Sequence, residues 1–444
     1  MSTVHAAKCE ALTRSLRAAG APVRLGKDTS NLFRDRAGVA RRKLDVRAFD
    51  QVLAVDAAAG WLDAEGMVGY EQLVDACLAR GAAPAVVPQL KTITLGGAVA
   101  GVGIEASSHR FGLVHETVAE LEVLVADGSV LVCTPDNDHA DLFFGFPNSY
   151  GTLGYALRVK AKAVPVLPHV RLEHLAFGSA DALFAAIESR CRAGDADFID
   201  ATAFSPDRLY LTLGRFAARA PYTSDYGYEH IYYRSIPEKR EDWLTTRDFL
   251  WRWDTDWFWC SKNLCAQQPL VRRLYGRRRL GSKTYARLMR WNSRLGLTRW
   301  LDRARGLHAE TVIQDVDIAL PQAAEFFSFY TREIGIWPLW ICPLGPRPGA
   351  ERFCLYPMRA EWYLNFGFWD VLRTRERYES GHFNRLVERK VLELGGIKSL
   401  YSDSYFPQDE FWSCYGGDAY RRLKTKYDPQ GVFPDLYAKC VLRQ

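Results

Sequence analysis

The first 165 residues alternate between hydrophobic and polar positions with the periods of strands and helices. In order, a strand, a strand pair, a helix and a further strand are predicted for KLDVRAF, QVLAVDAAAGWLDAEG, GYEQLVDACLARG and AAPAVVPQL. In ELEVLVADGSVLVCT two apolar β runs meet at Asp127-Gly128, which is a strong hairpin signal. The segment DLFFGFPNSYGTLGYALRVKAKAVPV then predicts a short helix, a glycine turn and a strand in which apolar and basic residues alternate.

From about residue 165 the pattern starts again, and it then repeats itself. A strand, a helix and two strands are predicted for HVRLEHLAF, SADALFAAIESRCRAG, DFIDATAFS and RLYLTLGRF. After a long insertion the same order returns in ETVIQDVDIAL, PQAAEFFSFYTREIG, WPLWICPL and EWYLNFGFW. Two βαββ halves predict an antiparallel sheet flanked by helices, and therefore an α+β fold. The C-terminal LKTKYDPQGVFPDLYAKC is expected to return to the first domain.

The glycine-rich stretch TITLGGAVAGVGIEASSHRFG (92–112) contains a match to the dinucleotide fingerprint G-x-G-x-x-G/A, from Gly101 to Ala106. Asp127 follows about 20 residues later, where the fingerprint has a ribose-binding carboxylate. A Rossmann loop must open a helix, however, and SSHRFGLVHETV is a poor helix because Gly112 interrupts it. Asp127 is also needed for the hairpin turn. The residues therefore favour a glycine turn that holds a cofactor in another way.

Composition restricts the class of protein. At 444 residues, with 48% hydrophobic and 25% charged residues, the chain is typical of a globular protein with two or three domains. Ten cysteines without a C-x-x-C pair or zinc spacing predict small buried hydrophobes, no metal site and a reducing cytosol. No stretch reaches the ~18 apolar residues of a membrane span, and the N-terminus lacks the apolar core of a signal peptide. A cytoplasmic protein is expected, either soluble or peripheral on the inner face of the cell membrane.

Four motifs stand in a fixed order: VDAAAGWLDAEG with VVPQL, the TLGG turn, the long Gly/Ser/His loop, and DLFFGFPNSYGTLGY. This order resembles the FAD-binding, PCMH-type group of oxidoreductases, named after vanillyl-alcohol oxidase and p-cresol methylhydroxylase. Within that group, the Δ24-sterol reductase branch is similar in GVGIEASSHRFGL, ADGSVLVCTP, QDVDIAL, WPLWICP, LYSDSYF and EFW. The run WRWDTDWFWCSK (251–262) resembles bacterial relatives that reduce methylene-branched fatty acyl chains.

The resemblance implies three parts: a two-lobed FAD-binding domain over 1–165, a substrate cap over 166–400, and a C-terminal segment, 401–444, that returns to the FAD domain. It also implies that main-chain amides of glycine turns hold the FAD diphosphate, where a Cβ would block the ligand. RLGKDTSNLFR (24–34) takes the place of the first diphosphate loop, although its residues would equally suit an N-cap. Because this loop lacks the His of covalently flavinylated relatives, non-covalent FAD is expected. The expected cofactor-binding residues are Lys27, Ser30, Asn31, Gly96, Gly97, Gly101, Gly103, Ser107, Ser108, His109, Gly112, Thr152 and Gly154.

The insertion, 251–305, is unusually basic and aromatic. Residues 271–305 carry twelve Lys or Arg and one acid, Asp302, with Leu, Tyr and Trp interleaved. A basic amphipathic helix with Trp and Leu opposite its charges is typical of a membrane interface. No nucleic-acid module is recognised, so nucleic acid is not an expected partner, and a solvated basic face is the alternative. We expect an entrance for a lipid substrate at an anionic bilayer.

The resemblance implies reduction of an unactivated alkene in a lipid tail, by proton and then flavin hydride addition, with NADPH reducing the FAD. The substrate would be a methylene-branched fatty acyl chain or a sterol side chain, and a fatty-acyl methyltransferase is a possible partner. Two alternatives stay open: desaturation of a methylated acyl chain by the reverse reaction, and a non-enzymatic lipid-binding protein. The expected catalytic residues are Glu105, His109, Asp315, Tyr401 and Asp403, and the expected substrate residues are Gln314, Tyr405 and Trp257.

Overall fold

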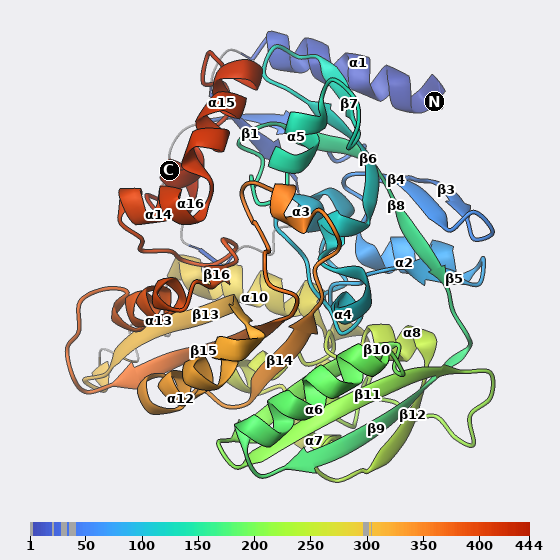
Figure 1. Ribbon diagram of the computed structural model, residues 1–444, viewed down its shortest axis with the longest axis vertical. Coiled ribbons are helices and arrows are strands. Elements are labelled where there is room, and N and C mark those ends of the chain that lie inside the picture. The colour runs from blue at the N-terminus through green and yellow to red at the C-terminus, as the bar shows by residue number, and fades with distance from the viewer. Residues whose placement is uncertain (1–2, 20–21, 28–32, 35–40, 296–301, 303) are drawn as a thin grey trace.

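The computed structural model describes residues 3–19, 22–27, 33–34, 41–295, 302 and 304–444. It has two main parts, each built on its own antiparallel sheet (Figure 1). A six-stranded sheet lies in the N-terminal domain, in the upper half of the view, and an eight-stranded sheet lies below it. This arrangement confirms the expected α+β class.

The N-terminal domain follows the predicted order of elements. Its sheet has the order β3-β4-β8-β6-β7, with β5 paired to β8, and a separate parallel pair is formed by β1 and β2. Its elements are α1 (Thr3–Arg17), β1 (Val23–Gly26), β2 (Arg42–Asp45), β3 (Val52–Asp56), β4 (Trp61–Glu65), α2 (Tyr70–Leu78), β5 (Ala82–Pro84), α3 (Leu95–Ala100), α4 (Ser108–Phe111), η1 (Val114–Thr117), β6 (Val118–Leu124), β7 (Val130–Cys133), α5 (Ala140–Gly145) and β8 (Tyr155–Pro165). The helix α3 was not predicted, because its two glycines are poor helix formers.

Two predictions about the N-terminal domain are confirmed. The Asp127-Gly128 turn joins β6 to β7, and Gly128 has the positive φ, 85°, that this turn requires. The glycine stretch does not open a long helix, since only the four-residue α4 follows it and α3 precedes it. The structural context of a Rossmann loop is therefore missing.

The second part, which we call the cap, consists of two βαββ halves that meet side by side. Its sheet has the order β12-β9-β11-β10-β14-β15-β13-β16, and the pairing of β10 with β14 joins the halves. The halves comprise β9 (His169–Phe177), α6 (Ala180–Ala193), β10 (Phe198–Ser205) and β11 (Arg208–Ala217), and β13 (His308–Ala319), α12 (Ala323–Glu333), β14 (Leu339–Leu344) and β15 (Tyr363–Thr374). Flanking elements are β12 (Glu241–Thr245), η4 (Leu320–Gln322), η5 (Ala350–Arg352), α13 (His382–Glu393) and β16 (Ile397–Lys398).

The two faces of the cap sheet differ in chemistry. Helices α6, α12 and α13 cover one face (Figure 1), and the side chains between them and the sheet form one apolar cluster. The opposite face packs in the same cluster as the N-terminal domain and carries polar residues. Across neighbouring strands, Asp317 pairs in register with Asn365, which pairs with Cys342. The polar face of the cap therefore meets the N-terminal domain, where a site between the two parts would lie.

The insertion is helical and more deeply packed than its sequence predicts. It contains η2 (Cys260–Leu264), α9 (Pro269–Tyr275), η3 (Arg277–Arg279) and α10 (Ser282–Leu295), and it is preceded by α7 (Tyr232–Ser235) and α8 (Thr246–Leu250). The run WRWDTDWFWCSK was expected to offer aromatic surface, and this expectation is wrong. Its five large aromatic residues are all buried, namely Trp251, Trp253, Trp257, Phe258 and Trp259. Trp253, Phe258 and Trp259 pack with one another, and Phe258 also contacts Trp340 and Trp369 of the cap sheet.

The C-terminal segment lies against the N-terminal domain (Figure 1). It contains α14 (Gln408–Cys414), α15 (Gly417–Tyr427) and α16 (Leu436–Cys440). The backbone nitrogens of Ala126 and Val23 donate to the carbonyls of Tyr427 and Val432, at 3.3 and 3.0 Å. All ten cysteines are free thiols, and six of them are buried.

Candidate functional site

Two loops of the N-terminal domain come together at Tyr150. The glycine turn after α3 and the loop from Asn148 to Gly154 are joined by a hydrogen bond from Tyr150 N to Ala100 O, at 3.1 Å. Val102, Asn148 and Tyr150 have positive φ angles of 51°, 61° and 50°. Such angles are strained for non-glycine residues, above all for a β-branched one, and they concentrate at ligand sites. The paired loops are therefore a candidate binding site.

Four of the expected cofactor glycines are required by the packing of the protein itself. An added Cβ would meet Gly66 O at 2.9 Å from Gly96, Val114 Cγ2 at 2.9 Å from Gly103, Glu116 Cδ at 2.5 Å from Gly112 and Val123 Cγ1 at 2.6 Å from Gly154. The expectation that a Cβ at these positions would meet the ligand and not the core is therefore corrected. At Gly97, which is exposed, a Cβ would meet only the Thr94 side chain. Among the expected cofactor glycines, Gly97 is therefore the one that is open to a ligand.

The polar residues of the Gly/Ser/His loop bond mainly to the protein. Ser107 Oγ donates to Ala85 O at 2.8 Å, and Ser108 Oγ accepts from Glu105 N at 3.1 Å. The two nitrogens of His109 lie 2.9 and 3.2 Å from backbone carbonyls. Burial lowers the pKa of His109 to about 4, so the imidazole is neutral and is a poor acid at neutral pH. In the second loop Thr152 Oγ1 donates to Ser149 O at 2.8 Å.

Other buried polar atoms near these loops have no partner within the described part of the chain. They are Gln89 Nε2, Ser149 Oγ, Asn148 Oδ1 and Arg34 Nη2. Buried polar groups are normally hydrogen-bonded, so unpaired ones beside strained loops fit a polar ligand such as FAD. Lys27 is half-buried at the end of the described part of the first diphosphate loop. Ser30 and Asn31 lie outside the described residues.

A half-buried acid stands on the polar face of the cap. Asp315 on β13 hydrogen-bonds to Tyr401, and Tyr401 Oη accepts a 2.7 Å hydrogen bond from Trp369 Nε1. Asp315 Oδ1 is buried and has no hydrogen-bond partner among the described residues. Burial raises the pKa of Asp315 to about 7. Arg34 links this region to the candidate cofactor loops, because its guanidinium lies 5.0 Å from the ring centroid of Tyr150 and donates to the carbonyl of Leu400, next to Tyr401, at 2.7 Å.

The neighbouring acid, Asp317, provides a contrast on the same face. Its Oδ2 accepts from Tyr356 at 2.6 Å, and its Oδ1 accepts from Asn365 at 2.8 Å. Both oxygens are therefore occupied by protein donors, whereas Asp315 keeps one oxygen free. This difference favours Asp315 as the reactive carboxyl and Asp317 as a structural one.

Three expected residues are placed away from Asp315. Gln314 lies on the opposite, helix-covered face of β13, where it is fully buried against Asn384 of α13. Consecutive strand residues point to opposite faces, so a site with Asp315 excludes Gln314. Tyr405 Oη accepts from Arg443 at 3.0 Å, and Asp403 pairs with the same arginine at 3.5 Å. The structure thus brings Tyr401 and Asp315 together, whereas Gln314, Asp403 and Tyr405 have other partners.

Glu105 is part of a buried charge cluster that was not predicted. Arg252 Nη2 lies 2.7 Å from Glu105 Oε1 and 2.9 Å from Asp200 Oδ2, and all three side chains are buried. Burial raises the pKa of Glu105, and the charge of Arg252 opposes this shift. The cluster joins the glycine-rich loop, the cap sheet and the insertion. This bonding favours a structural role for Glu105.

Trp257 belongs to a column of aromatic rings. It stacks on Tyr285 of α10 with 6.2 Å between ring centroids, and it contacts Phe33 at 5.4 Å. Phe33 in turn contacts Tyr401 at 5.8 Å. Sequence reasoning singled out neither Phe33 nor Trp369 as site residues. The only signal was their position in the expected first diphosphate loop, RLGKDTSNLFR, and in the predicted strand EWYLNFGFW.

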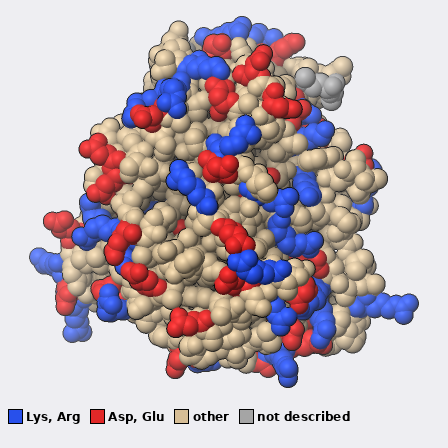
Figure 2. Space-filling view, in the orientation of Figure 1, with Lys and Arg blue, Asp and Glu red and all other residues tan. Residues whose placement is uncertain are grey.

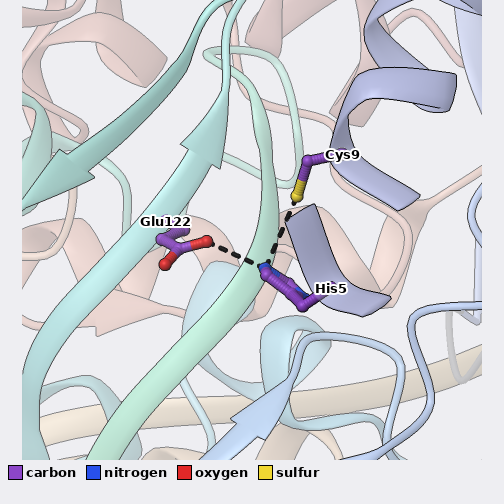
Figure 3. Close-up of side chains that lie close together, drawn as sticks. All are labelled: His5, Cys9 and Glu122. Carbon is purple, nitrogen blue, oxygen red and sulfur yellow. Dashed lines mark hydrogen bonds and ion pairs between the residues drawn. The ribbon is translucent and has the colours of Figure 1, made fainter. Parts of the chain in front are cut away.

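A further cluster has the residue types of a metal site. His5 and Cys9 of α1 and Glu122 of β6 hold potential ligand atoms within 4.8 Å of one another (Figure 3). However, His5 Nδ1 bonds to Glu65 at 2.7 Å and His5 Nε2 bonds to Glu122 at 2.9 Å. Hydrogen bonds to Cys9 and to Glu122 raise the pKa of His5 to about 10, so the ring is protonated and its nitrogens are donors. The geometry favours an ion-paired anchor for α1 over a metal site.

Comparison with known proteins supports the cofactor assignment. A family model described as FAD binding domain matches residues 4–134. The Δ24-sterol reductase of Homo sapiens is 25% identical over 409 residues, which are 87% of this chain and 75% of the human protein. That of Pisum sativum is 25% identical over 445 residues, covering 90% and 76% of the two chains. A putative D-arabinono-1,4-lactone oxidase of Neurospora crassa is 33% identical over 117 residues, or 26% of this chain and 21% of the oxidase.

The match to an FAD binding domain agrees with the strained loops and with the unpaired polar atoms beside them. The similarity to sterol reductases extends through the cap, which contains Asp315 and Trp369. These findings confirm the resemblance that the motifs indicated. The chain therefore has an FAD binding domain and is similar over most of its length to Δ24-sterol reductases, which supports an FAD-dependent oxidoreductase of a Δ24-sterol reductase-like branch.

Proposed function

We propose that the protein reduces a carbon–carbon double bond in a lipid tail, with NADPH as the electron donor and with non-covalent FAD as the cofactor. The observation that carries the proposal is Asp315, a half-buried carboxyl group whose Oδ1 is buried without a hydrogen-bond partner among the described residues, near the ring of Tyr401. The similarity to Δ24-sterol reductases supports an alkene as the substrate. A sterol side chain and a methylene-branched fatty acyl chain both offer such a bond.

The chemistry of an isolated alkene explains the need for an acid. No carbonyl group is conjugated to the double bond, so hydride addition alone would leave an unstabilised carbanion. A proton placed first on the less substituted carbon gives a tertiary cation, which can then accept hydride. Bound FAD supplies the hydride chemistry. Asp315 supplies the proton, since its pKa of about 7 keeps a large fraction of the group protonated at neutral pH.

Other side chains orient the acid and keep the site dry. Tyr401 is fixed by Trp369 and lowers the pKa of Asp315 by hydrogen bonding, and Oδ1 of this carboxyl group has no partner among the described residues. Phe33 and Trp257 extend the apolar wall from Tyr401 toward the insertion. These rings would place an apolar tail beside the acid. We propose that the paired glycine-rich loops bind FAD, in particular through Gly97, Gly101 and Ser149, and that Lys27 contributes to the same site.

The test is an anaerobic two-step experiment. The purified holoprotein is mixed with NADPH while the flavin absorbance is followed, and bleaching is expected. Candidate alkenes are then added, with a sterol bearing a side-chain double bond in one arm and a methylene-branched phospholipid in the other. Recovery of flavin absorbance with one saturated product identifies the substrate class. Bleaching without recovery in either arm contradicts alkene reduction, and flavin reduction by a saturated methyl-branched chain indicates the desaturating direction.

A further inference from the structure

Two helices of the insertion expose large apolar side chains. Leu270 and Leu274 lie one turn apart on α9 and are 75% and 80% exposed, the highest fractions of any large apolar side chain that the structure describes. On α10, Trp291 is 59% exposed and Met289 is 37% exposed. We call these four side chains the apolar edge. A group of exposed apolar side chains marks an interaction surface, because exposure of so much apolar area to water is unfavourable and a partner that covers it removes this cost.

The cations beside the apolar edge are available for an outside partner. Arg273, Arg278 and Arg279 are exposed and form no ion pair with any residue that the structure describes. Arg277, by contrast, pairs with Asp225, and Lys283 pairs with Glu71 at 2.6 Å. On the molecular face of Figure 2, positive and negative side chains are intermingled. The apolar edge therefore has uncompensated positive charge beside it, which favours an anionic partner.

The exposed residues are held by a rigid base. Arg272 of α9 is buried, and its two terminal nitrogens bond to both oxygens of Asp256, at 2.6 and 2.9 Å. Tyr275 at the end of α9 contacts the buried ring of Tyr285 on α10, with 6.4 Å between centroids. The two helices are thus fixed from below, while Leu270 and the arginines point outward.

We propose that the apolar edge and the arginines Arg273, Arg278 and Arg279 dock the enzyme on an anionic lipid surface. Leucine and tryptophan suit the boundary between head groups and acyl chains, and arginine suits the phosphates. Among the described residues, no helix is both long enough and apolar enough to cross a bilayer. Docking of this kind would bring the enzyme to a bilayer-borne substrate, so the inference rests on the proposed function and deepens it.

Ring contacts connect the buried base of α10 with the proposed active site. From Tyr285 on α10, ring contacts run through Trp257 and Phe33 to Tyr401, which bonds to Asp315. A lipid tail that leaves the bilayer at α10 would therefore follow an aromatic wall to the acid. These ring contacts favour a membrane over a nucleic acid as the partner, because an apolar lipid tail can pack against them and a phosphate backbone cannot.

Co-sedimentation of the holoprotein with vesicles tests the proposal. Vesicles of phosphatidylcholine alone are compared with vesicles that also contain phosphatidylglycerol, at low and high salt. Binding is expected with the anionic vesicles and should weaken with salt. Replacing Arg273, Arg278 and Arg279 by Gln should weaken binding about a hundredfold, because each arginine near such a surface contributes about fivefold in affinity. Leu270→Ser with Leu274→Ser should weaken it by about tenfold or more, at both salt concentrations.

Matched variants elsewhere on the chain serve as controls. Arg80→Gln with Arg389→Gln removes exposed arginines, and Leu167→Ser with Leu442→Ser removes exposed leucines. These controls should leave binding within about twofold of the unmodified protein. The proposal is overturned if no vesicle binds, if the docking variants bind like their controls, or if duplex DNA competes fully with anionic vesicles. Turnover of a detergent-dispersed alkene separates the two proposals, since it should survive the docking substitutions even where vesicle binding is lost.

Discussion

The indole nitrogen of Trp369 donates a 2.7 Å hydrogen bond to the hydroxyl oxygen of Tyr401. The proton of that hydroxyl is then left for its other partner, Asp315. A hydrogen bond donated to a carboxylate favours the charged form, so Tyr401 lowers the pKa of Asp315 while burial raises it to about 7. Trp369 thus determines the direction of a proton beside the candidate acid.

Tyr401→Phe should shift the pH dependence of catalysis. Because the substitution removes a donor to the charged form of Asp315, the pKa of this carboxyl should rise above about 7. The protonated acid then persists to higher pH, and the falling limb of kcat/KM should move upward by about one pH unit. Tyr405→Phe is the control, since the Tyr405 hydroxyl bonds to Arg443. An unmoved limb in Tyr401→Phe contradicts the assignment.

Asp315→Asn should reduce turnover with the alkene by about 10²- to 10⁴-fold, the usual contribution of a general acid. The residual activity of the variant should no longer depend on pH near 7, because the amide at this position does not titrate. Flavin content and reduction by NADPH should stay within about twofold of the unmodified protein. In Asp317→Asn the pH limb should remain, since both oxygens of Asp317 are bonded to protein donors. If both variants lose the pH dependence near 7 equally, Asp315 is not the general acid.

Much of the fold follows from local sequence patterns. The alternation in β8 and the Asp127-Gly128 hairpin are short-range features, and both appear as predicted. The repeated βαββ order is confirmed for the same reason. The helix α3 and the burial of the tryptophan-rich run were missed, because both depend on distant partners such as Gly66 and Trp369.

The site was only partly predictable. Tyr401 and Asp315 were named from motifs, but nothing local in the sequence shows that Trp369 and Phe33 meet them. Gln314 was grouped with Asp315 because the two are consecutive, although the two-residue period of a strand separates them onto opposite faces. Pairings between residues far apart in the chain, such as that of Glu105 with Arg252, need the folded structure.

Gly97→Val and Gly103→Val should differ in their effects on stability. A side chain at Gly103 meets Val114, Pro88 and Ala98, so it should lower the free energy of unfolding by about 1–3 kcal/mol as well as weakening FAD binding. At Gly97 it meets only Thr94, so FAD retention should fall while the apoprotein unfolds at nearly the same urea concentration. Flavin fluorescence after gel filtration and urea unfolding measure the two quantities. Full FAD retention in Gly97→Val would place the cofactor elsewhere.

FAD should dissociate from the denatured protein. The first diphosphate loop, residues 24–34, contains no histidine, the residue to which covalently flavinylated relatives attach the cofactor. After acid precipitation the yellow chromophore is expected in the supernatant, and its absorbance should account for the flavin of the native sample. Flavin that stays with the pellet after repeated washing shows a covalent bond and contradicts the expectation.

Arg252→Met should be among the most destabilising single changes in this chain. It leaves the buried carboxylates of Glu105 and Asp200 without their shared cation, and breaking a buried ion pair in this way costs about 3–5 kcal/mol. Without Arg252, the pKa of Glu105 should rise further, so protonation at lower pH should restore part of the lost stability. Urea unfolding at pH 7 and at pH 5 measures both effects. Arg247→Met is the control, because its pair with Asp75 is half exposed and should contribute less than about 1 kcal/mol. If both variants lose the same small amount, the cluster does not hold the cap and the FAD domain together.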